Sequence, residues 1–261
     1  MTWVEIIVLI ISGLFVGFIN TLAGGGSIIS LSILMFLGLP ANVANGTNRI
    51  AILIQNIAAV GSFRQQKVLD HKKGFWLAIP ATIGSIIGAW IAVDLNEAVI
   101  EKAIAVVMLI MMFVILYKPQ RWLKGKEELQ QKKVTVGQVI LFFAIGIYGG
   151  FLHMGVGYAL LAGIVLGAGY DLVKANAIKV FIILIWSPVI LVVFMINGQV
   201  NYLYGLILSI GNVAGALIAS RLAVKQGAVF VRWVIIAVIL LTAAHVFGLV
   251  DIQEMLGFVG E

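Results

Sequence analysis

Long apolar runs separated by short polar or glycine-containing stretches dominate the chain. The runs of the first half are Val4–Ile19, Ile28–Leu39, Ile50–Phe63, Phe75–Val93 and Val99–Tyr117. Those of the second half are Val136–Leu152, Tyr158–Leu166, Ala177–Ile196, Leu203–Val224 and Val229–Val250. A helix needs about 20 mostly apolar residues to cross a bilayer, and most of these runs approach that length. The pattern predicts an all-α polytopic membrane protein in contact with a lipid bilayer.

The two halves of this pattern resemble each other. The stretch "ANGTNRIAILI" from Ala44 returns as "ANAIKVFIILI" from Ala175, and the same offset joins Phe63 to Phe194 and Gly84 to Gly215. We therefore divide the chain into a first membrane repeat at 1–117, a basic cytoplasmic linker at 118–135 and a second membrane repeat at 136–261.

The basic residues predict how the halves are oriented. Arg64, Lys67, Lys72 and Lys73 cluster in one loop of the first half, whereas the equivalent loop of the second half, "NGQVNY" from Asn197, is uncharged. Lys and Arg are enriched in cytoplasmic loops, so the halves should have inverted topology. We expect both termini to be external and the protein to lie in the cell (inner) membrane.

The stretch "NTLAGGGS", Asn20–Ser27, interrupts an apolar region. Each glycine costs a helix interior about 1 kcal/mol relative to alanine, so continuous helix is disfavoured there. Since lipid cannot satisfy free backbone groups, a broken helix must be buried in protein or line a polar cavity. Either five short spans or three spans plus a re-entrant hairpin would make each half cross an odd number of times. In inverted-repeat transporters the broken helices meet near the midplane of the membrane, where substrate binds. In this chain the two broken helices would be those at Asn20–Ser27 and at "LHMGVGY", Leu152–Tyr158.

Close helix packing is the alternative interpretation of these glycines. Adjacent glycines do not share one face of a helix, and this weakens the alternative for Gly24, Gly25 and Gly26. The pairs with a spacing of four fit that packing role better; they are Gly13 with Gly17, Gly84 with Gly88 and Gly211 with Gly215.

The composition limits the chemistry. The chain is 62% hydrophobic and 11% charged, has a net charge of +6 and contains no cysteine. Its carboxylates fall in loops or at the ends of apolar runs, which disfavours cation transport and metal binding. No HExxH or GxSxG motif occurs, so we expect neither an enzyme nor a cofactor, and the basic residues suit loops better than nucleic acid.

The polar residues that remain inside apolar runs are neutral or hydrogen-bond donors, which suits a small anionic substrate. We assign substrate binding to Asn20, Gly24, Gly25, Gly26, Ser27, Asn45, Thr47, Asn48, Arg49, His153, Asn176 and Lys179. Arg49 ranks above Lys179 as the counter-charge, although it could instead snorkel to the interface. His153 could take up a proton in a proton-coupled cycle or serve only as a structural hydrogen-bonding group. Asn45 and Asn176 could also cap the helices that follow them.

Two stretches, "GFINTLAGGGSIISL" and "GLPANVANGTNRIAIL", resemble the first-half signatures of the TauE/SafE family of membrane permeases. The second half is less similar, because "HMGVGY" replaces the glycine triplet there. The resemblance implies transport of sulfite or of an organosulfonate, which we expect to proceed by alternating access. A passive anion channel and a structural membrane subunit are the alternatives, and the sequence sets no oligomeric state.

Overall fold

The computed structural model describes residues 1–94 and 125–246, and in these ranges every regular element is a helix. The first half contains α1 (Trp3–Leu22), α2 (Ser27–Phe36), α3 (Ala41–Gln65) and α4 (His71–Asp94). The second part contains α7 (Glu127–Gln131), α8 (Val136–Phe151), α9 (Val156–Ala162), the π-helical turn η1 (Gly163–Gly167), α10 (Leu172–Ile196) and α11 (Tyr202–Val246). The backbone of α11 is interrupted by a kink at Gly227, where φ is 77° and ψ is −174°. The apolar run Val99–Tyr117 and the start of the linker lie outside the described residues.

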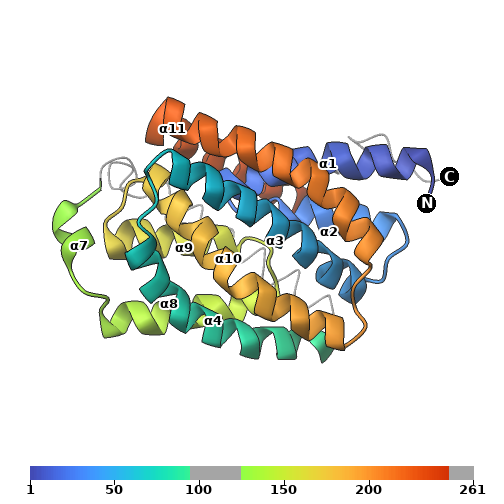
Figure 1. Ribbon diagram of the computed structural model, residues 1–261, viewed down its shortest axis with the longest axis horizontal. Coiled ribbons are helices and arrows are strands. Elements are labelled where there is room, and N and C mark those ends of the chain that lie inside the picture. The colour runs from blue at the N-terminus through green and yellow to red at the C-terminus, as the bar shows by residue number, and fades with distance from the viewer. Residues whose placement is uncertain (95–124, 247–261) are drawn as a thin grey trace.

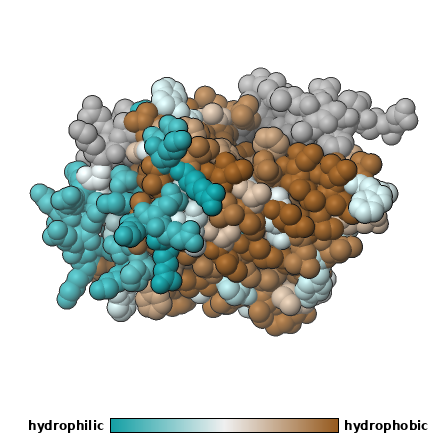
Figure 2. Space-filling model, turned by 45° about the horizontal axis from the view of Figure 1, so that its top comes forward, coloured by the Kyte–Doolittle hydropathy of each residue, from teal (hydrophilic) through white to brown (hydrophobic). Residues whose placement is uncertain are grey.

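Four of the described helices are long and apolar enough to cross a membrane: Trp3–Leu22, His71–Val93, Leu172–Ile196 and Tyr202–Leu241. Large apolar side chains on these helices are exposed, and Figure 2 shows them as a broad brown surface. In water such a surface would be unfavourable, whereas lipid tails would cover it. The prediction of an all-α polytopic membrane protein is confirmed at this level.

Helix α2 is much shorter than a span. Its 10 residues extend about 15 Å, which is half of the roughly 30 Å of hydrocarbon in a bilayer. Val156–Gly167, formed by α9 and η1, is the corresponding short apolar stretch of the second half. Each of these short elements follows a longer helix, and each precedes a helix of 25 residues, α3 or α10.

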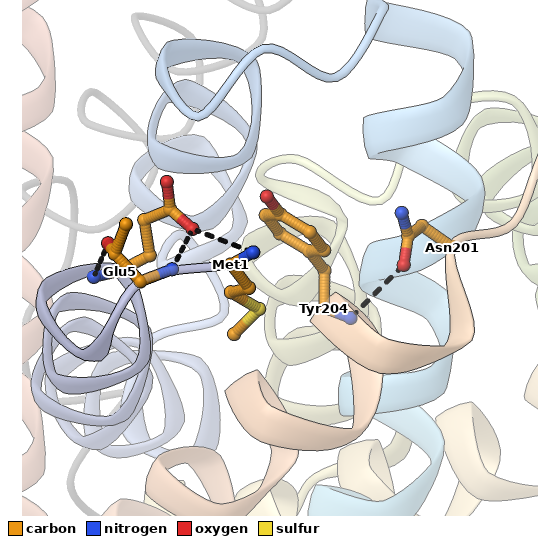
Figure 3. Close-up of polar contacts among 5 residues, drawn as sticks. Met1, Glu5, Asn201 and Tyr204 are labelled. Carbon is orange, nitrogen blue, oxygen red and sulfur yellow. Dashed lines mark hydrogen bonds and ion pairs between the residues drawn. The ribbon is translucent and has the colours of Figure 1, made fainter.

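The helices begin at two opposite ends of the molecule. Figure 1 shows α4, α8 and α10 beginning at the end where α7 lies, whereas α1 and α11 begin at the opposite end. At the α7 end, Tyr170 Oη donates to Asp70 Oδ2 over 2.6 Å, which joins the residues that precede α10 and α4. At the other end, Asn201 Oδ1 accepts from Tyr204 N over 3.2 Å at the start of α11. Figure 3 shows this bond together with the N-terminal Met1 and with Glu5 of α1.

Glycines bring the two halves into close contact. A Cβ on Gly17 of α1 would lie 2.1 Å from Asn212 O of α11, and one on Gly211 would lie 2.0 Å from Ile10 O. The same holds between α4 and α8, where a Cβ on Gly84 would lie 2.1 Å from Phe143 O. The prediction that the glycine pairs with a spacing of four serve helix packing is confirmed.

Two predicted helix starts are wrong. Helix α3 begins at Ala41 after Pro40, and α10 begins at Leu172 after Asp171, whose side chain accepts from Val173 N and Lys174 N. Asn45 and Asn176 therefore lie inside helices and cap neither of them. The polar residues near these starts do not end the helix, because hydrogen-bond partners are close by. Asn45 Nδ2 donates to Phe151 O at the end of α8, and Asn176 Oδ1 accepts from Lys179 Nζ of the same helix.

Backbone conformation repeats along the chain. Residues with positive φ recur at the offset of 131 that relates Ala44 to Ala175. The pairs are Gly24 (91°) with Gly155 (70°), Gly38 (89°) with Gly169 (78°), and Lys67 (58°) with Gly198 (67°). A left-handed residue usually marks a turn or a helix end, so the two halves change direction at equivalent positions.

Basic residues gather at the α7 end of the molecule, which is the teal end of Figure 2. Arg64 at the end of α3 and Lys72 at the start of α4 are exposed, and Lys126, Lys132 and Lys133 are exposed around α7. Gln66 Nε2 donates to Ser220 O over 3.5 Å, so the exposed Arg221 belongs to the same end.

Candidate functional site

The two segments that interrupt the helices touch each other. Helix α1 ends at Leu22 and α2 begins at Ser27, while α8 ends at Phe151 and α9 begins at Val156. A Cβ on Gly24 would lie 2.3 Å from Gly157 Cα, and one on Gly25 would lie 2.2 Å from Tyr158 Oη. Only glycine permits this approach, and at Gly24 the φ of 91° independently favours it.

Lys179 of α10 reaches the end of α1. Its ammonium donates to Asn20 O at 3.0 Å, to Thr21 O at 2.8 Å and to Asn176 Oδ1 at 2.6 Å. Its side chain is completely buried, so Lys179 is not an exposed residue at the start of a segment. Carbonyls in the last turn of a helix carry its negative partial charge and therefore stabilise the cation.

Arg49 of α3 makes the equivalent contact with the end of α8. One terminal nitrogen donates to Gly149 O over 3.0 Å, and the other donates to Gly150 O over 3.1 Å and to Asn45 Oδ1 over 3.2 Å. The guanidinium carbon lies 5.4 Å from the centre of the Phe194 ring. Arg49 is only 1% exposed, so the alternative that it snorkels to the interface is wrong in this structure.

Neither buried cation pairs with a carboxylate among the described side chains. The ion pair in these ranges joins the N-terminus to Glu5. Burying an isolated charge is costly, and helix-end carbonyls offset only part of that cost. A buried positive charge without a carboxylate partner would be stabilised by a nearby anion.

Several buried polar atoms near the two interruptions have no hydrogen-bond partner among the described residues. Those that can donate are Asn48 Nδ2, Arg49 Nε, Asn176 Nδ2, Trp186 Nε1, Tyr158 Oη and Thr21 Oγ1. His153 Nδ1 and Asn20 Oδ1 are also unpaired. The His153 ring lies edge-on to Trp186 with their centroids 6.5 Å apart. Buried polar groups are normally satisfied, so these spare donors are free to bind water or a ligand.

The other predicted residues divide into two groups. Ser27 accepts from Asn20 Nδ2 over 3.4 Å, and Asn48 Oδ1 accepts from Ser30 Oγ over 2.9 Å, so these residues belong to the interruption between α1 and α2. Thr47 Oγ1 instead accepts from Asn201 N over 2.9 Å and fixes the start of α11. Thr47 is therefore engaged in a contact away from the glycine segments.

Sequence reasoning missed Ser30, Tyr158 as a donor, and Trp186. Trp186 had a detectable signal, because it lies in the middle of an apolar run and not at its end, where interfacial tryptophans occur. In the described ranges no group of three or more His, Asp or Glu side chains could hold a metal ion.

These observations define a helical membrane protein with a buried cationic centre. The profile of the family described as "Sulfite exporter TauE/SafE" matches residues 9–246, and the chain belongs to this family. It is accordingly a membrane transporter and not an enzyme. No solved structure matches the chain.

Its relatives include bacterial proteins named "Probable membrane transporter protein". One from Haemophilus influenzae is 24% identical over 90% of this chain and 92% of its own length. ORF9 from a Sinorhizobium species is 27% identical over 88% and 87%, and YfcA from Escherichia coli K12 is 26% identical over 97% and 93%. The similarity thus extends over nearly the whole of each protein.

Proposed function

We propose that this protein transports a small anion, with sulfite or an organosulfonate as the leading substrate. The anion binds between the interrupted segments Asn20–Ser27 and Leu152–Tyr158, and alternating access exposes this central site to each side of the membrane. The observation that carries the proposal is the pair of buried cations, Arg49 and Lys179, that lack a carboxylate partner among the described side chains.

The spare donors support an oxyanion as the substrate. Arg49 Nε, Asn48 Nδ2, Asn176 Nδ2 and Trp186 Nε1 can only donate, and sulfite and sulfonate oxygens accept hydrogen bonds. A cation would meet two positive charges here, and a neutral solute would leave those charges uncompensated. The family name agrees with an oxyanion of sulfur, but the donors themselves carry the argument.

We further propose that residues 1–117 and 136–261 are inverted repeats joined by a cytoplasmic linker. The recurrence of positive φ at one offset and the opposite directions of α3 and α10 in Figure 1 support this interpretation. The basic α7 end would face the cytoplasm, so both termini would be external in the inner membrane. In this arrangement the two interruptions enter from opposite sides and meet near the midplane.

Ligand-dependent thermal stabilisation of the purified protein tests the anion site. A ligand of the folded state present at 100 times its Kd stabilises by about 2.7 kcal/mol. We expect sulfite or a short sulfonate to raise the Tm, and simple cations to have no effect. Stabilisation by a cation or a neutral solute, with no response to any anion, would contradict the proposal.

Variants that remove one buried positive charge test whether the anion binds at the proposed site. Arg49→Gln and Lys179→Gln should each weaken sulfite binding by at least about tenfold, because each removes a buried positive charge. The matched controls are Arg64→Gln on α3 and Lys174→Gln on α10, since both residues are exposed on the same helices. Equal losses in the variants and in their controls would exclude the site.

Flux into proteoliposomes distinguishes a carrier from a channel. A carrier should saturate with sulfite and show countertransport, in which sulfite on one side accelerates the exit of labelled sulfite from the other. A passive channel would give an unsaturated current with no such acceleration. The comparison of flux with and without a proton gradient tests whether the transport is proton-coupled.

A further inference from the structure

The hydrogen bonds of the two buried cations cross between the halves of the chain. Lys179 lies on α10 of the second half but binds the carbonyls of Asn20 and Thr21 on α1 of the first half. Arg49 lies on α3 of the first half but binds the carbonyls of Gly149 and Gly150 on α8 of the second half. Each cation therefore holds the last turn before the interruption of the opposite half.

An asparagine orients each cation. Asn45 and Asn176 are related by the offset of 131, and their Oδ1 atoms accept from Arg49 and Lys179 respectively. Asn45 Nδ2 also donates to Phe151 O over 3.4 Å, so it contacts the end of α8 directly. The arrangement is built twice from different cations, which argues against a chance contact.

We infer that Arg49 and Lys179 are reciprocal positioning residues, each of which fixes the interrupted helix of the other half. Without the ammonium of Lys179, the last carbonyls of α1 lose their charged donor, and the segment Ala23–Gly26 loses its anchor to α10. Without the guanidinium of Arg49, the segment after α8 loses its anchor to α3. A charged hydrogen bond is worth more than a neutral one, so each loss should favour local opening of one interruption.

The two cations differ in the number of N–H donors that are left to bind an anion. An ammonium has three N–H donors, and all three of those of Lys179 are used by Asn20, Thr21 and Asn176. Arg49 keeps its Nε–H unpaired although its side chain is buried. This inference deepens the proposed function: Arg49 both positions α8 and contacts the anion, whereas Lys179 acts on the anion through its charge and through α1.

Cysteine labelling tests the crossed pattern without any anion, because the chain has no native cysteine. The reporters are Ala23→Cys and Leu152→Cys, which replace the buried residues at the ends of α1 and α8. In each reporter background, the rate of labelling by a membrane-permeant maleimide measures local opening. Lys179→Met should accelerate labelling at position 23 about tenfold and leave position 152 unchanged, and Arg49→Met should do the reverse.

The controls separate positioning from general destabilisation. Lys174→Met and Arg64→Met replace exposed cations on α10 and α3 and should change neither rate. If a methionine variant fails to fold, the glutamine variant at the same position replaces it. Acceleration within the same half, equal acceleration at both reporters, or no change would each overturn the inference. Since the assay contains no anion, it can succeed when the sulfite-binding test fails, and the two failures are distinguishable.

Discussion

At the scale of single residues, the chain places its polar groups in two different environments. Arg49 and Lys179 are buried at the ends of interrupted helices, whereas Asp70 and Tyr170 form a contact at the basic end, outside the helices. The sequence marked both cations as candidates, but it could not show that helix-end carbonyls receive them. That outcome depends on which helix ends pack against α3 and α10.

The Asp70 carboxyl gives a prediction about pH. Burial raises its pKa, but hydrogen bonds from Tyr170 Oη and from the backbone N–H groups of Lys73 and Lys72 outweigh burial, so the pKa lies below its ordinary value of 3.8. A carboxyl with a lowered pKa stabilises the fold above its ordinary pKa and loses that contribution as the pH falls through the lowered value. We expect the Tm to decrease as the pH falls below about 4.

Two variants test whether Asp70 causes this dependence of the Tm on pH. Asp70→Asn should flatten the dependence of Tm on pH in this acidic range, and Tyr170→Phe should weaken it, because it removes the 2.6 Å hydrogen bond. Glu128→Gln on the exposed surface of α7 is the control and should leave the profile unchanged. A Tm profile of Asp70→Asn that matches the wild type would show that other groups dominate acid unfolding.

At the scale of elements, glycine spacing determines how closely helices pack. Gly13 and Gly17 of α1 lie against Leu208 and Asn212 of α11, while Gly84 and Gly88 of α4 lie against Phe143 and Ile147 of α8. Lipid provides no hydrophobic force that would drive helices together, so this close backbone contact is an important source of stability.

Adding a single methyl group at this interface should separate the helices. Gly17→Ala places a Cβ 2.1 Å from Asn212 O, and we expect it to destabilise the protein by about 1–3 kcal/mol. Gly61→Ala on α3 is the matched control, because nothing lies within 4 Å of its added Cβ and alanine favours helix. Thermal unfolding in detergent should show a lower Tm for Gly17→Ala and an unchanged or higher Tm for Gly61→Ala.

At the scale of the whole molecule, the proposed inverted repeat predicts which loops face the cytoplasm. Lys72 lies in the first turn of α4, whereas the connection before α11 contains Gln199 and no charge. In Figure 1 α4 and α11 begin at opposite ends of the molecule, as inverted repeats require.

Labelling of single introduced cysteines in intact cells tests this topology. Lys72→Cys should react with an impermeant maleimide only after the membrane is opened, whereas Gln199→Cys should react from outside. Both positions are at least partly exposed, so labelling reports the side of the membrane more than local burial. Reaction of both cysteines from the same side would exclude the inverted-repeat arrangement.

The sequence by itself determined that the protein is helical and belongs in a membrane. The lengths of the apolar runs, the glycine spacing and the positions of the charges depend only on neighbouring residues and on the surrounding lipid or water. The sequence also singled out Asn20–Ser27 and the two buried cations. Only the tertiary structure decided where α3 and α10 begin, that Asn45 and Asn176 are not caps, and that Thr47 belongs to another contact. It likewise decided which cation holds which helix end, because those bonds join residues more than 90 positions apart. No local pattern in the chain encodes such pairs.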